Sequence, residues 1–119
     1  MAKSDLDAVA KALERGDYQT AFGEIKSLAD QGNPEAQFKI GIIFAYGKDV
    51  SKNQSEATAW FRKAAAQGYA NAQYALALIY NEGQGVEKDY AQAVKWFERA
   101  AKQGLAPAQY GLAVKYGQG

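Results

Sequence analysis

The chain has 119 residues, no cysteine and no histidine, and its 14 Lys and Arg against 13 Asp and Glu leave a net charge of +1. This length fits one ordinary domain with its own core, and the missing thiols and imidazoles exclude disulfides, Cys or His nucleophiles and the usual zinc, copper and haem ligands. The near-neutral charge offers no basic field to nucleic acid or anionic lipid, so we expect neither as a partner.

The N-terminal stretch MAKSDLDAVA lacks the apolar segment of a signal peptide, and no apolar run in the chain approaches the length of a membrane span. We therefore expect a soluble chain without membrane insertion. It would be cytoplasmic as given, or periplasmic or secreted if a leader has been removed.

The first predicted elements are two helices separated by Gly16. Asp17 is expected to cap the second, which runs through Ile25 to Ala29. This helix has Glu24 where later helices have Trp, and a terminal unit richer in charge is typical of the end of a repeat array. Residues 1–32 are thus predicted to be an N-terminal capping repeat. The apolar face of the first helix is expected to hold Leu6, Val9, Ala10 and Leu13.

Residues 34–46 predict the next helix, helix A of a repeat, because apolar residues recur at three-and-four spacing. Pro34 stands in its first turn, where a missing backbone amide costs nothing. Its core face is expected to hold Ala36, Ile40, Ile43 and Phe44.

A second helix, helix B, is predicted to start after Asn53. Asn53 is an N-cap residue with Glu56 three positions later, the capping-box arrangement. Gly68 is expected to end the helix in a left-handed conformation. The core stripe between them is predicted to hold Ala57, Trp60, Phe61 and Ala64.

The same pattern returns after 36 residues, since Gly32, Gly68 and Gly104 are equally spaced. Such a period indicates one stacked supersecondary unit. We predict repeats at 33–68 and 69–104, with Asp89 and Gln92 as the second capping box. The equivalent core residues are Ala72, Leu76, Ile79, Tyr80, Ala93, Trp96, Phe97 and Ala100.

Residues 105–119 predict a truncated final repeat, because the pattern stops at Gly119, inside a loop. Leu112 and Tyr116 would then lack a following helix B. A solenoid end without a polar cap is an adhesive surface. We expect either further repeats in the native protein or weak, concentration-dependent self-association through this end.

The predicted fold class is all-α: a single α-solenoid domain over residues 1–119, with about seven helices. Within residues 72–104 stand Ala-x-x-x-Leu-x-x-x-Tyr, Gly-x-Gly-Val, Asp-Tyr-x-x-Ala and Trp-Phe-x-x-Ala-Ala-x-Gln-Gly. On these motifs the chain resembles the Sel-one-like repeat family of the tetratricopeptide superfamily, from about Asp17 to its end. The resemblance implies a right-handed superhelix with A helices on the concave side, protein interaction as the function, and no chemistry.

The other face of helix A is also apolar in every repeat. One interpretation is packing between repeats; the other is a ladder of rigid aromatic anchors along a partner-binding groove, the residue type that dominates interface hot spots. Two asparagines would add polar contacts. The candidate groove residues are Phe38, Ile42, Asn71, Tyr74, Leu78, Asn81, Tyr110 and Val114.

Two other features carry weaker signals. The GQGV segment beginning at Gly83 has neither the preceding strand nor the Lys-Ser/Thr of a phosphate-binding loop, which favours a simple turn. Glu82 and Glu87 are expected on an exposed loop, and Asp89 is a helix cap. These carboxylates therefore do not predict general acid–base catalysis.

Together these patterns predict a non-catalytic scaffold or adaptor that binds a peptide segment or partner protein in the concave groove. We expect no cofactor, no metal and no catalytic residue. Two alternatives stay open: an accessory repeat domain of a larger enzyme, and a carbohydrate- or peptidoglycan-binding module whose sugar rings stack on the tyrosines.

Overall fold

The computed structural model describes residues 7, 9–12, 14–46 and 53–111, and within these ranges every regular element is a helix. Five helices have 13 residues each, and shorter helical stretches include residues 7, 9–12 and 14 and the segment 106–111. The all-α prediction is confirmed. The long helices are α2 (Tyr18–Asp30), α3 (Pro34–Tyr46), α4 (Gln54–Ala66), α5 (Ala70–Glu82) and α6 (Tyr90–Lys102).

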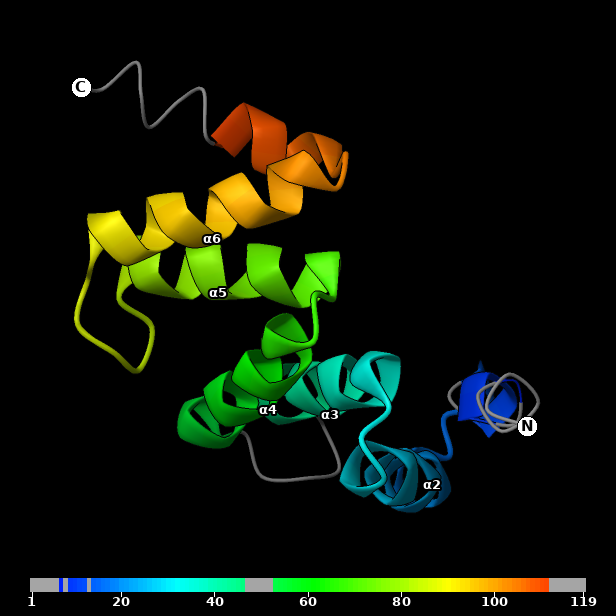
Figure 1. Cartoon of the computed structure of the whole chain (residues 1–119). Helices are drawn as coiled ribbons and strands as arrows, with labels where there is room; N and C mark the ends of the chain where they lie inside the picture. Colours follow the sequence, from blue (N-terminus) through cyan, green and yellow to red (C-terminus); the bar gives the residue numbers. More distant parts are fainter. Residues whose placement is uncertain (1–6, 8, 13, 47–52, 112–119) are drawn as a thin grey trace.

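The helices stack in chain order, as Figure 1 shows: α2 packs on α3, α3 on α4, α4 on α5 and α5 on α6. The pairs α3/α4 and α5/α6 form two helical hairpins, and the principal extents of 45 × 28 × 23 Å describe an elongated stack. Contacts that join each element mainly to its sequence neighbours are the property of a solenoid.

The predicted N-caps are confirmed. Asp17 Oδ1 accepts from the Thr20 amide at 3.3 Å, Asn53 Oδ1 from the Glu56 amide at 3.0 Å, and Asp89 Oδ1 from the Gln92 amide at 3.1 Å. Each bond satisfies a backbone donor that the first turn of a helix leaves without a partner. Helices α2, α4 and α6 therefore begin where local side-chain chemistry predicts.

Glycines end the same three helices. Gly32, Gly68 and Gly104 have φ of 96°, 90° and 87°, in the left-handed region that the sequence pattern predicts. Only glycine enters this region without a steric cost from Cβ, so the chain reverses direction sharply at each repeat boundary. After Gly32, helix α3 begins with Pro34.

The core consists of three clusters of buried apolar side chains, which follow one another along the stack of helices. The predicted helix A stripe is confirmed, since Ala36 and Ile40, like Ala72 and Leu76, are fully buried. In the first helical segment Val9 and Ala12 are buried, whereas Ala10 is exposed, so its predicted place in the core was wrong. A helix turns 100° per residue, which takes Ala10 off the face that Val9 presents to α2. Leu6, Leu13, Leu112 and Tyr116 lie outside the described side chains.

The two tryptophans differ in burial although they occupy equivalent positions. Trp60 is only 7% exposed and belongs to the cluster that α2 and α3 form, as predicted. Trp96 packs against both of the next two clusters, as a core residue is predicted to do, but it is only half-buried. A cation covers each ring: Lys63 Nζ lies 4.3 Å from the Trp60 ring centroid, and the Arg99 guanidinium 4.7 Å from that of Trp96.

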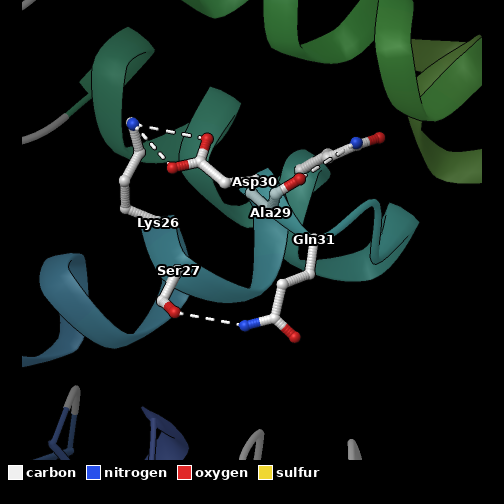
Figure 2. Close-up of polar contacts among 6 residues, drawn as sticks. Lys26, Ser27, Ala29, Asp30 and Gln31 are labelled. Carbon is white, nitrogen blue, oxygen red and sulfur yellow. Dashed lines mark hydrogen bonds and ion pairs between the residues drawn. The ribbon is translucent and has the colours of Figure 1, made fainter.

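Glutamine side chains join neighbouring repeats by hydrogen bonds. Gln37 Nε2 donates to the Ala29 carbonyl at 3.2 Å, a bond drawn in Figure 2 beside the Lys26–Asp30 ion pair and the Gln31–Ser27 contact. Gln67 Nε2 donates to both Gln37 Oε1 and the Gly32 carbonyl, each at 2.9 Å.

The next repeat reproduces this arrangement with Gln73 and Gln103. Gln73 donates to the Ala65 carbonyl at 3.3 Å, and Gln103 donates to Gln73 Oε1 at 3.0 Å and to the Gly68 carbonyl at 2.7 Å. Gln37 and Gln73 are buried, so these bonds satisfy groups that would be costly without partners. They also hold each helix A in register against the end of the preceding helix B.

Candidate functional site

An open hollow of about 330 Å³ lies between α3 and α5. These two helices, which are equivalent by the 36-residue period, supply most of its lining, and α4 and the turn after α5 supply the rest. Three of the lining residues, Ala45, Phe61 and Ile79, also belong to the second core cluster. The lining consists of Phe38, Ile42, Ala45, Tyr46, Gln54, Phe61, Asn71, Tyr74, Ala75, Leu78, Ile79, Glu82 and Gln84.

The structure brings five of the eight candidate groove residues together in this hollow: Phe38, Ile42, Asn71, Tyr74 and Leu78. The other three are elsewhere. Tyr110, on the segment 106–111, is 74% exposed and lies outside the lining. Asn81 faces away from the hollow, and its buried Oδ1 has no hydrogen-bond partner among the described residues. Val114 lies outside the described residues.

Two of the candidate aromatic anchors also pack inside the repeats. The Phe38 ring lies 5.6 Å from that of Phe61 and 5.5 Å from that of Tyr69, and the Tyr74 ring lies 6.0 Å from that of Phe97. Phe38 and Tyr74 are half-buried by these contacts. Phe38 thus packs between repeats through Tyr69, as one interpretation expects, whereas the ring contact of Tyr74 lies within its own repeat. Both residues also line the hollow.

The most exposed apolar side chains of the hollow belong to α3. Ile42 is 37% exposed and Tyr46 is 71% exposed. Tyr46 was not a candidate groove residue, although it stands four positions after Ile42 and eight after Phe38, which places it on the same stripe of a helix. That spacing was the signal that could have identified it.

The polar part of the lining consists of three amides and one carboxylate: Gln54, Asn71, Gln84 and Glu82. Glu82 is the last residue of α5, not a loop residue as predicted, because the helix continues to the left-handed Gly83 before it turns. Its Oε1 accepts a hydrogen bond from Gln84 Nε2 at 2.7 Å. The segment 83–86 is a turn, as its glycines indicate.

One ionisable group beside the hollow has a shifted pKa. Burial raises the pKa of the Tyr69 phenol above its ordinary value of 10.0, the negative charge of Glu35 raises it further, and a hydrogen bond with the side chain of Asn71 opposes the shift. Tyr69 therefore stays a neutral hydrogen-bonding group next to Asn71 at physiological pH.

The described part of the chain forms no candidate metal site. Its carboxylates form no group of three or more that could hold a metal ion. None of the helices described here is long and apolar enough to cross a membrane. The arrangement can offer shape, apolar contact and hydrogen bonds to a bound molecule.

Comparison with known proteins identifies the repeats. The Sel1 repeat family matches residues 34–69, 70–105 and 106–119. The fold is similar to the crystal structure of a protective antigen of uropathogenic Escherichia coli with an SLR fold, at 42% identity and a TM-score of 0.79 over 82% of this chain and 21% of that one. It is also similar to a Sel1 repeat protein from Oxalobacter formigenes, at 36% identity and a TM-score of 0.83 over 88% of this chain and 43% of that one.

A third structure supports the fold alone. Helicobacter pylori cysteine rich protein B is 23% identical, with a TM-score of 0.75 over 89% of this chain and 90% of that one. The chain spans less than half the length of the first two bacterial proteins. A search among curated proteins found no match.

Proposed function

The chain belongs to the Sel1 repeat family, and from this premise we propose that it is a non-catalytic scaffold that binds a peptide segment of a partner protein in the hollow between α3 and α5. Sel1 repeat proteins generally act as protein-interaction scaffolds. The observation that supports the position of the site is the exposure of Ile42 and Tyr46 inside a concave, mostly apolar lining. Exposed apolar surface in a concavity is the usual mark of a binding site.

The chemistry of the lining suits an extended polypeptide. Apolar and aromatic side chains held on helices that are each packed against α4 lose little entropy when they bind, which is the property of hot-spot residues. The amides of Gln54, Asn71 and Gln84 can each donate to a carbonyl and accept from an N–H of a bound backbone. An extended segment could therefore place a side chain in the hollow and form backbone hydrogen bonds with these three amides.

A sugar ligand fits the same lining less well. Stacking on a sugar ring requires an open aromatic face, and the rings of Phe38 and Tyr74 already pack against other rings. Tyr46 is the one highly exposed aromatic side chain of the lining, so it offers a single ring and not a ladder of rings. Much of the remaining wall is aliphatic, from Ile42, Leu78 and Ile79. These side chains contact apolar groups and cannot stack as aromatic rings do.

Capture of partners from the native lysate tests the proposal when three forms of the protein are compared. The variant Ile42→Ser/Tyr46→Ser removes the exposed apolar part of the hollow, and Tyr90→Ser removes an exposed tyrosine ring at the start of α6. We expect the first variant to lose partners that wild type and Tyr90→Ser retain. Equal capture by all three forms, or glycan binding that survives removal of every protein partner, would reject the proposal.

A further inference from the structure

We propose that the hollow selects a cationic peptide segment, one that places a Lys or Arg beside Glu82 while a bulky apolar side chain contacts Ile42 and Tyr46. This inference rests on the proposed function and adds the charge of the partner. It follows from three features of the hollow: its lining charge, the helix ends that meet there, and the absence of an ion pair between Glu82 and a described Lys or Arg.

Glu82 is the one charged residue among the thirteen that line the hollow. Within the described residues the ion pairs join Lys26 to Asp30 at 3.0 Å and Lys39 to Glu35 at 3.8 Å, both outside the lining. Glu82 instead accepts its hydrogen bond from the neutral amide of Gln84. The lining thus presents a carboxylate that forms no ion pair with a described Lys or Arg; Lys88, whose side chain lies over Gly83, is outside the lining.

Two helix ends add to this negative charge. Helices α3 and α5 both end at the hollow, since their last residues, Tyr46 and Glu82, line it. The carbonyls of a helix C-terminus carry a partial negative charge, equivalent to roughly half an electron. The field at this end of the hollow therefore favours a cation.

The outer helices show how the same chain balances such ends elsewhere. Helix α4 has Lys63 in its last turn and α6 has Arg99 and Lys102, whereas α3 and α5 have no basic residue there. Helix α5 even ends with an acid, the residue type that a C-terminus disfavours. A bound Lys or Arg would supply a counter-charge that no described residue in the last turn of α3 or α5 provides.

The same features argue against an acidic partner segment. A carboxylate in the hollow would meet Glu82 and two helix C-termini with like charge and would have no lining cation to pair with. The hollow, at about 330 Å³, lies at the lower end of the roughly 300–1,000 Å³ typical of ligand sites. That volume suits one or two anchoring side chains of an extended segment.

A phage-displayed library of random peptides tests the inference with three forms of the full chain: wild type, Glu82→Gln and Glu87→Gln. Glu87→Gln is the matched control, because it removes the same charge from an exposed loop position outside the lining. Peptides that depend on the hollow are those lost from Ile42→Ser/Tyr46→Ser. Their affinities are then measured with the basic residue replaced by Gln or Glu.

We expect hollow-dependent peptides from wild type and Glu87→Gln to be enriched in Lys or Arg beside an apolar residue, and those from Glu82→Gln to lose the basic preference. Replacing the basic residue by Gln should weaken binding to wild type about two- to fivefold, the range of an exposed ion pair. Binding to Glu82→Gln should change little.

Two results would overturn the inference in different ways. Hollow-dependent peptides with no charge preference, or with an acidic one, would reject the cationic partner and leave the proposed function standing. A library that yields no hollow-dependent peptide would reject the peptide-binding function itself, and the inference with it.

Discussion

The substitution Gly41→Ala should destabilise the protein, although alanine is the better helix former. Gly41 is buried within α3, and a Cβ built there would lie 2.5 Å from Cε1 and 2.7 Å from Cδ1 of Phe61. The Phe61 ring is itself buried and packs against Phe38, so it has little room to retreat. Overpacking a core in this way typically costs about 1–3 kcal/mol.

Helix propensity opposes this cost and has to be subtracted. Replacing glycine by alanine inside a helix gains roughly 0.5–1 kcal/mol. Gly23 in α2 isolates that gain, because a Cβ added at this exposed position would meet nothing within 4 Å. We therefore expect Gly23→Ala to stabilise the fold and Gly41→Ala to destabilise it, with about 1–3 kcal/mol between the two variants.

Chemical denaturation measures this difference as a shift of the unfolding midpoint at constant slope. The double variant Gly41→Ala/Phe61→Leu should lose less stability than the sum of its single changes, because the smaller side chain vacates the space that the new methyl group needs. If Gly41→Ala stabilises the protein as much as Gly23→Ala does, the close packing of α3 on α4 described here is wrong.

Three further predictions concern the free energy of unfolding. Trp60→Ala should lower the free energy of unfolding by about 3–5 kcal/mol, the range for a buried tryptophan, and Trp96→Ala should lower it clearly less. Equal losses of stability in the two variants would contradict the different burial of the two side chains. Gln67→Ala should cost about 1 kcal/mol, because it breaks one bond to Gly32 of the preceding repeat and one to the buried Gln37. Gln31→Ala, which breaks one exposed contact to Ser27, should be nearly neutral. Because the pKa of Tyr69 is raised in the folded state, the folded protein keeps the phenol proton at a pH where the unfolded chain has released it, so the free energy of unfolding falls as the pH rises above 10.0. Tyr69→Phe should reduce this loss of stability. If the variant and wild type lose stability equally at alkaline pH, the shift is refuted.

Helix boundaries could be predicted from the sequence because their causes are local. The Asn53 and Asp89 caps each bond an amide three residues away, and Gly68 turns the chain by its own backbone conformation. The 36-residue period then predicts which helices are equivalent and which face of each is buried. Interactions within a few residues need no knowledge of how the repeats stack.

The site could be predicted only in part, because it depends on the relative positions of two helices one repeat apart. Phe38 and Tyr74 follow from the apolar stripe of helix A, but the rim formed by Glu82 and Gln84 depends on where α5 ends against α3. Tyr110 shows the limit of periodicity. It is the equivalent of Tyr74, but the structure describes its segment only over 106–111, so the second wall of an equivalent hollow beside α5 is described only in part.

The central claim is that a partner segment binds between α3 and α5. The most direct test is amide chemical-shift mapping, in which a hollow-dependent peptide from the selected library is added to the protein. We predict that titration perturbs the amides around Ile42, Asn71, Tyr74 and Glu82 and leaves the exposed faces of α4 and α6 unchanged. Perturbations concentrated on α4 and α6, with the amides of the hollow unaffected, would contradict it.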